Sequence, residues 1–280
     1  MKTFGLDLTK EELEQDGTEY LAGSLPPCKA AGLDSLPFNE LKKYLPRGEI
    51  QHSDVEDMMD CASRDKINYL ETKYNYLFQN GLLSPKQISF AINHGYYTER
   101  GFEFSDAFIA IKSNTTRQGN SLKAPLQAIH ENGLVPKQLL PLEADMSWEE
   151  YHNPERITDA MEELGQQWLE VMGEIFYEKE YDYTKEVGIV TAVFAWPSVN
   201  NEGKYIRVEG GYNHAVYRPK PQHFIFDNYI DEVDGDFIKE TVSDFNFHPY
   251  GYTIVIGDPK PRQKVAWPID LFKRFINIFQ

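Results

Sequence analysis

The sequence predicts an α+β fold in which helices come first along the chain and strands follow. Helical spacing of apolar side chains dominates the first half of the 280 residues, whereas short β-branched runs separated by Gly, Pro and Asp dominate the last third. Strands that follow one another without intervening helices favour an antiparallel arrangement over a parallel α/β sheet. We therefore expect two segregated parts, one helical and one made of strands.

The strongest helical pattern covers residues 60–81. Asp60 is a good N-cap, which places Cys61 at the first helical position, and Asn80-Gly81 is a typical C-terminal stop. Its apolar side chains recur at i, i+3 and i+4, namely Ile67, Leu70, Tyr74, Leu77 and Phe78. Further helices are predicted over residues 84–95 and 121–133, both ending on Gly, and a long acidic one over residues 155–182.

Four strands are predicted in the last third of the chain. The first, EVGIVTAVFAW at residues 186–196, is β-branched and apolar, as a buried strand is. The others cover residues 205–218, 223–230 and 250–257.

The two ends of the chain differ from the middle. Residues 1–45 are predicted to be an N-terminal extension, with a short acidic helix followed by coil rich in Pro and Gly, ordered only by lying on the rest of the protein. Residues 257–280 form a C-terminal tail whose last twelve residues are largely apolar. Core packing is the first interpretation of that tail, and docking on a partner protein is the alternative.

Composition and charge exclude several classes of protein. Lys and Arg number 28 against 44 Asp and Glu, for a net charge of −16, so nucleic acid is not an expected partner. No apolar run reaches the ~18 residues of a membrane span, and the first residues lack the apolar region of a secretion signal, so a cytoplasmic location is favoured. The Asn-Thr-Thr at residues 114–116 is therefore interpreted as a loop rather than a glycosylation site. Cys28 and Cys61 could form one bridge, but reduced thiols in a cytosolic protein are favoured.

Cys61 has a position that can activate a thiol. A thiol becomes a nucleophile as the thiolate, and a helix N-terminus and a nearby imidazolium both lower its pKa. His214, 153 residues further on, can supply the imidazolium, and Asp227 can orient that ring, with Asn228 as the weaker candidate. The chain order Cys, His, then Asn or Asp is one known solution for a thiol nucleophile. The six other histidines show no metal-ligand spacing, namely His52, His94, His130, His152, His223 and His248.

Several stretches, in this order, resemble the papain-like cysteine proteases. DCASRDKINYLE is similar to the family's helix that begins at its nucleophile, and TTRQGNSLKAPLQAIHENGLVPKQLLPL to the segment whose glycines line the substrate cleft. VGIVTAVFAWPS is similar to the first long strand of the barrel lobe, and GGYNHAVY to the strand that carries the catalytic base. HFIFDNYID is similar to the strand that ends in Asn-Ser-Trp, and PYGYTIVI to the closing Gly-Tyr strand. The likeness spans residues 46–256 approximately.

The resemblance implies a two-lobe fold with an active-site cleft between a helical lobe, about residues 46–145, and an antiparallel β-barrel lobe, about residues 146–256. Residues 1–45 would then be similar to a pro-segment. The resemblance also implies a catalytic triad, a peptide or protein substrate and no cofactor. The residues implied are Cys61, His214 and Asp227 as the triad, Gln51 as the oxyanion donor, and Gly119, Asn120, Asn213 and Tyr229 as substrate-binding residues.

Three departures from the family pattern leave other functions open. The Cys-Gly-Ser-Cys-Trp signature is absent, Gln51 lies ten positions before Cys61, and the carboxylates of Glu56, Asp57 and Asp60 surround the cysteine in sequence. The first hypothesis is a cysteine peptidase. The alternatives are a catalytically silent binding or structural protein on the same fold, and an amidase or acyl transferase that uses the same Cys-His chemistry.

Overall fold

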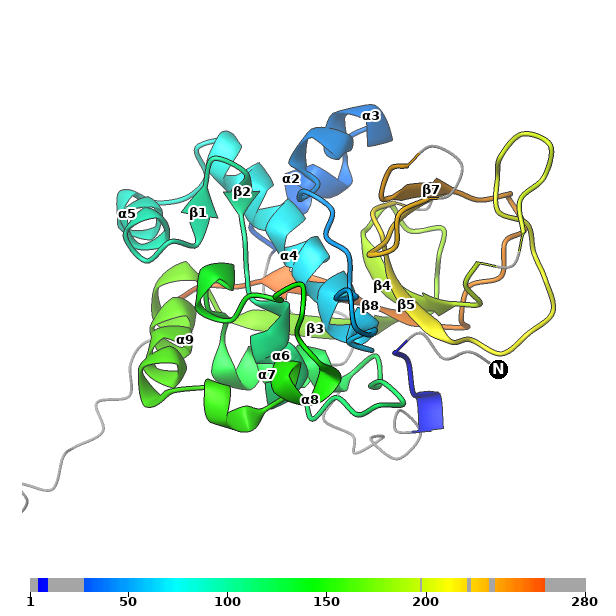
Figure 1. Ribbon diagram of the computed structural model, residues 1–280. Helices are drawn as coiled ribbons and strands as arrows, with labels where there is room; N and C mark the ends of the chain where they lie inside the picture. Colours follow the sequence, from blue (N-terminus) through cyan, green and yellow to red (C-terminus); the bar gives the residue numbers. More distant parts are fainter. Residues whose placement is uncertain (1–4, 10–27, 197, 221–222, 232–234, 260–280) are drawn as a thin grey trace, which may run out of the picture.

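Helices gather on one side of the molecule and strands on the other in the computed structural model (Figure 1). It describes residues 5–9, 28–196, 198–220, 223–231 and 235–259. The predicted acidic helix near the N-terminus falls mostly outside these ranges, and so does the apolar C-terminal run.

The helical part begins with short turns and continues to Met172. α4 lies between the other helices and the strands (Figure 1). The elements are α2 (Ala31–Asp34), α3 (Phe38–Leu41), η1 (Lys42–Tyr44), α4 (Cys61–Gln79), α5 (Pro85–Asn93), α6 (Asp106–Lys112), α7 (Ala124–Asn132), η2 (Lys137–Leu139), α8 (Trp148–Tyr151), η3 (Pro154–Arg156) and α9 (Asp159–Met172). A small hairpin of β1 (Tyr97–Thr98) and β2 (Gly101–Phe102) lies among them.

The β part is one antiparallel sheet of six strands, in the order β3-β8-β4-β5-β6-β7. Its strands are β3 (Ile175–Glu180), β4 (Ile189–Val193), β5 (His214–Arg218), β6 (Phe224–Phe226), β7 (Ile238–Glu240) and β8 (Gly251–Ile256). The prediction of a closed β-barrel was wrong, because no pairing among the described residues joins β3 to β7 and the sheet stays open.

Helix α4 is buried almost all round. Of its 19 residues, 16 are buried, because α4 packs against α6 and α7 on one side and against β5 on the other. Apolar side chains account for only part of this burial, and polar side chains such as Asn75 and Glu71 bond to backbone N–H groups of neighbouring segments. A helix enclosed in this way holds its first residue in a fixed place relative to β5.

The structure confirms the predicted helices at α4, α5 and α7 and the strand segments that contain β4, β5, β6 and β8. The long helix predicted over residues 155–182 was wrong, because the chain turns at Gly173 (φ 135°) and continues as β3. The coil predicted before residue 46 contains three helical turns, α2, α3 and η1. Helix α9 packs against α5 and α7, so helical packing extends past the predicted lobe boundary near residue 145.

Candidate active site

Cys61 is the first residue of α4 and is fully buried. The backbone N–H of Ala215, in β5, donates a hydrogen bond to its Sγ at 3.3 Å. Asp60 occupies the N-cap position but its side chain does not cap the helix. The positive end of the α4 dipole therefore points at the thiol without a side-chain acceptor in front of it.

His214 is the first residue of β5, and its ring joins Cys61 to Asp227. Its Nε2 lies 2.5 Å from Oδ1 of Asp227, and both side chains are fully buried. The ring also hydrogen-bonds to the thiol of Cys61. Because Nε2 is engaged with Asp227, Nδ1 is the nitrogen left for the sulfur. The structure thus brings together the cysteine, the histidine and the aspartate that the sequence singled out.

Asp227 is held by four donors rather than by His214 alone. Oδ2 accepts a hydrogen bond from Nε1 of Trp196 at 2.8 Å and lies 3.1 Å from Nζ of the buried Lys239. Oδ1 also accepts the backbone N–H of Asn228 at 2.7 Å. Burial opposes ionisation of this carboxyl, but His214 and Lys239 outweigh it and lower the pKa of Asp227 to about 2. The group is therefore a fixed carboxylate.

The surroundings disfavour the charged form of the Cys61 thiol and favour the charged form of the His214 ring. Burial is the largest influence on the Cys61 thiol and raises its pKa, whereas His214 and the N–H of Ala215 act to lower it. Burial also disfavours the charged form of His214, but Asp227 and Cys61 overcome this and hold its pKa well above the ordinary value. An imidazolium is thus favoured beside a thiol whose own ionisation is opposed mainly by its lack of solvent.

The three carboxylates next to Cys61 in sequence are each held by a partner other than the thiol. Asp60 accepts hydrogen bonds from Nε of Arg64 at 2.8 Å and from the hydroxyl of Tyr151 at 2.6 Å. Asp57 accepts the backbone N–H of Met59 at 2.8 Å. The acid that raises the pKa of the thiol is instead Asp65, one helical turn along α4 and paired with Lys66.

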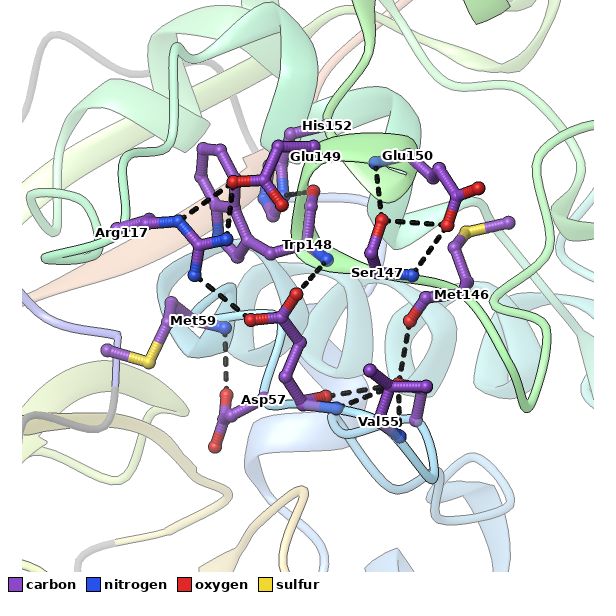
Figure 2. A network of polar contacts seen from close by, with 12 residues as sticks. Val55, Asp57, Met59, Arg117, Met146, Ser147, Trp148, Glu149, Glu150 and His152 are labelled. Carbon is purple, nitrogen blue, oxygen red and sulfur yellow. Dashed lines mark hydrogen bonds and ion pairs between the residues drawn. The ribbon is translucent and has the colours of Figure 1, made fainter.

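Figure 2 shows a network of polar contacts around Arg117 and Trp148 that ties three loops together. Glu56 belongs to this network. Its carboxylate accepts the backbone N–H of Trp148 at 2.7 Å and a hydrogen bond from Nη1 of Arg117 at 3.0 Å. Arg117 also bonds to Glu149 and lies over the ring of Trp148, 5.0 Å from its centre. The loops before α4, before α7 and at the start of α8 are thereby fixed to one another.

Gln51, the expected oxyanion donor, is fully buried and donates from Nε2 to Oδ1 of Asp57 at 2.8 Å. The hydroxyl of Tyr229 donates to the other oxygen of the same carboxylate. The ring of Tyr229 lies 5.2 Å from that of His214, centre to centre. Gln51 and Tyr229 are therefore joined through Asp57, with Tyr229 beside the imidazole.

Gly119 and Asn120 lie against the N-terminal segment of the chain itself. The backbone N–H of Asn120 donates to the carbonyl of Gly5 at 3.0 Å, and its carbonyl accepts the N–H of Asp7 at 2.8 Å, in parallel pairing around Leu6. Gly119 has φ 102°, and a Cβ there would lie 2.0 Å from the carbonyl carbon of Gly5. A Cβ on Gly5 would lie 2.5 Å from the carbonyl of Met59, two residues before Cys61. The segment thus lies between Gly119 and the residues just before Cys61.

The remaining predicted residues have structural contacts. Oδ1 of Asn213 accepts the backbone N–H of Ala195 at 2.9 Å, which fixes the end of β4 beside the start of β5. Asn228 accepts a hydrogen bond from Asn68 of α4 at 2.9 Å. Of the two candidates for orienting His214, it is thus Asp227 that contacts the ring.

Trp196 and Lys239 were missed in the sequence. Trp196 follows β4 closely, and an indole placed after a buried strand is a signal that could have drawn attention to it. Lys239 lies in the three-residue strand β7, which had no detectable sequence signal, and its burial beside Asp227 depends on the sheet.

No group of His, Cys, Asp or Glu among the described residues has the arrangement of a metal site. Within the same residues, no helix combines the length and apolar character needed to cross a membrane.

Comparisons with known proteins give likenesses in fold. No protein-family model matches the chain, and no curated protein matches its sequence. It is similar to xylellain, a cysteine protease from Xylella fastidiosa (TM-score 0.49, 14% identity, covering 80% of this chain and 91% of that one). It is also similar to digestive procathepsin L 3 of Tenebrio molitor larval midgut (TM-score 0.46, 10% identity, covering 86% of this chain and 73% of that one). A third likeness is to the proform of the ragweed pollen allergen Amb a 11, a cysteine protease (TM-score 0.48, 12% identity, covering 92% of this chain and 77% of that one).

Proposed function

We propose that this protein is a papain-like cysteine peptidase that hydrolyses peptide bonds through a thioester acyl-enzyme. The observation that carries the proposal is the continuous contact from the Cys61 thiol through the His214 ring to the Asp227 carboxylate, at the N-terminus of a buried helix. A nucleophile, a base in contact with it and a third group that orients the base form the arrangement expected for nucleophilic acyl transfer.

The reaction follows from the charges of these three groups. The Cys61 thiolate attacks the scissile carbonyl carbon, and the developing oxyanion is held by the backbone N–H of Cys61 and an N–H of the Gln51 amide. The imidazolium of His214 then gives its proton to the leaving amine, and the C–N bond breaks to leave a thioester. Water, deprotonated by His214, attacks the thioester and releases the acid. Asp227 stays ionised throughout and keeps the ring in place.

Residues 5–7 occupy the proposed substrate site. Gly5, Leu6 and Asp7 use the backbone groups of Asn120 that an extended peptide would use, and they pack on the stretch just before the nucleophile. Cys61 is fully buried in this arrangement, and burial is what raises the pKa of its thiol. We therefore propose that the described state is latent, and that the thiol becomes reactive when residues 5–7 leave.

The proposed peptidase activity is tested with fluorogenic peptide substrates and a pair of glycine variants. Gly5→Ala places a methyl group against the Met59 carbonyl and should dislodge the segment. Gly81 also has a positive φ (66° against 93° for Gly5), but a methyl group there would meet open space. We expect hydrolysis to rise at least tenfold in Gly5→Ala, to stay at the wild-type level in Gly81→Ala, and to vanish when Cys61→Ser is added.

Two outcomes separate the parts of this proposal. Equal activity in wild type and in both glycine variants, lost with Cys61→Ser, would contradict the latent state but keep the peptidase. Absence of hydrolysis in every variant, with a reactive Cys61 thiol, would favour an amidase or acyl transferase, which the same three groups can serve.

A further inference from the structure

A second feature of the β part is a buried arginine without an acidic partner. Arg218, the last residue of β5, is 5% exposed. Its Nη1 donates to the carbonyl of Tyr183 at 3.1 Å, while its Nε has no hydrogen-bond partner among the described residues. Within the same residues, no carboxylate lies within 4.0 Å of its guanidinium. A buried charge without a counter-ion is strongly unfavourable, because it has lost its hydration and gained no opposite charge.

Aromatic rings compensate for part of this cost. The guanidinium lies 5.4 Å from the ring centre of Tyr183 and 5.1 Å from that of Phe247, and these two rings stack on each other. Such cation–π contacts stabilise a guanidinium that has lost its water. Desolvation nevertheless lowers the pKa of Arg218 to about 10, so the surroundings still disfavour its charge.

The carboxylate that favours the charge of Arg218 already has a partner. Glu186 acts favourably on the charge of Arg218, but its carboxylate lies 3.2 Å from Nζ of Lys220 and its side chain is 67% exposed. In a chain of net charge −16, an unpaired buried cation is not explained by a shortage of carboxylates. An anion bound from solution would supply the missing counter-charge.

Arg218 lines a pocket of about 610 Å³. Phe245 and Phe247 supply an apolar wall, and Thr184, Ser243 and Asn246 supply hydroxyl and amide groups at its border. A volume of this size suits a small organic molecule, and Phe245, Phe247 and the guanidinium of Arg218 combine an apolar wall with a buried charge, as ligand sites do. Glu186 also lines the pocket, with its exposed carboxylate paired to Lys220. The pocket lies at the opposite end of β5 from His214, so it is separate from the site described above.

We propose that this pocket binds a small organic carboxylate, with the carboxylate on the guanidinium of Arg218 and an apolar body against Phe245 and Phe247. A guanidinium matches a carboxylate better than any other side-chain cation, because its N–H groups are arranged in a planar fork. The proposal does not depend on the peptidase activity, because none of its residues belongs to the Cys61 site.

Isothermal titration calorimetry of the full-length chain tests the proposal, with 3-phenylpropionate as the probe and the neutral 3-phenylpropanamide as its match. We expect saturable one-site binding of the acid and at least tenfold weaker binding of the amide, because a charge-assisted hydrogen bond is lost. A tripeptide ending in a free Phe carboxylate distinguishes a peptide C-terminus from a free acid, and binding by either supports the pocket. Equal affinity for acid and amide, or no saturable binding of any carboxylate probe, would overturn it.

Two variants locate the binding. Arg218→Met keeps the apolar length of the side chain but removes the guanidinium, and it should abolish binding of the acid. Lys185→Met removes a nearby, exposed cation whose partner is Glu180 and not a residue of the pocket, and it should leave the affinity within about twofold. If Arg218→Met binds the acid as wild type does, the assignment is wrong. Should that variant fail to fold, the comparison of acid with amide on wild type still decides the question.

Discussion

Asp227 holds the candidate site together at the scale of single residues. It accepts from His214, Trp196 and Lys239 at once, so its ionised state is set before any substrate arrives. A preorganised carboxylate raises the pKa of the imidazole, and the imidazolium in turn stabilises the thiolate. The reactivity of the Cys61 thiolate near neutral pH should therefore depend on this one charge.

Replacing Asp227 with Asn should narrow the pH range in which Cys61 reacts. Without the carboxylate, the pKa of His214 falls, so the imidazolium that stabilises the thiolate is lost as pH rises through a lower value. We expect the alkylation rate of Cys61 to drop about tenfold at pH 7.5, between the lowered and the original pKa of His214, and much less at pH 9.5, where the thiolate forms without help. Rates from iodoacetamide labelling and mass spectrometry check this, with circular dichroism as the control for folding. A uniform drop at both pH values would contradict it.

Replacing Gln51 with Ala should separate oxyanion stabilisation from thiol activation. Alkylation by iodoacetamide creates no oxyanion, so its rate at Cys61 should be unchanged within about twofold, whereas loss of one oxyanion donor lowers acylation by about 10²–10³. Stopped-flow acylation with an activated ester measures the second rate, in the Gly5→Ala background. An acylation rate equal to that of the unmutated background would remove Gln51 from the proposed mechanism.

Local sequence patterns, such as helix caps and apolar spacing, predicted some of these residues and not others. Cys61 could be placed at a helix start from Asp60 and the apolar spacing alone, although Asp60 turned out to bond Arg64 and Tyr151 rather than to cap the helix. The positions of Trp196 and Lys239 beside Asp227 depend on long-range pairing in the sheet, which no local pattern encodes.

At the scale of elements, α4 and β3 show where periodicity succeeds and fails. α4 was predicted from an apolar stripe, yet much of its burial comes from polar side chains that bond to other segments. β3 was merged with α9 because its acidic, alternating sequence continues the acidic helix without a Pro. It is the edge strand of the sheet, where charged side chains such as Glu178 are tolerated.

Helix α5 offers a test of an element whose start was predicted from sequence. Ser84 accepts a hydrogen bond from the N–H of Gln87 and Gln87 bonds back to the N–H of Ser84, which forms a capping box. Ser84→Ala should lower the free energy of unfolding by about 1 kcal/mol in urea denaturation. Ser89→Ala, in the exposed middle of the same helix, is the matched control and should change it by less than about 0.5 kcal/mol. Equal effects would show that the box contributes nothing.

At the scale of the whole molecule, helices and sheet meet at α4 and β5, and the candidate site lies at that junction. Cys61 begins the helix and His214 begins the strand, so neither side chain could reach the other without the packing of α4 on β5. The sequence did not predict that the sheet stays open. The family resemblance implied a closed barrel, and the sequence of one strand does not show whether the two edge strands of a sheet pair with each other.

The most direct test of the central claim is the rate at which an electrophilic thiol probe labels Cys61 in wild type and in His214→Ala. A peptidyl vinyl sulfone serves as the probe, and both proteins carry Gly5→Ala. Cys28 in the same chain is the internal reference, because its thiol bonds to Nζ of Lys73 rather than to His214. If His214 activates the thiol, Cys61 should label at least about 10²-fold faster with the histidine than without it, while Cys28 labels equally in both. Equal labelling of Cys61 in the two proteins would contradict the proposed catalytic pair.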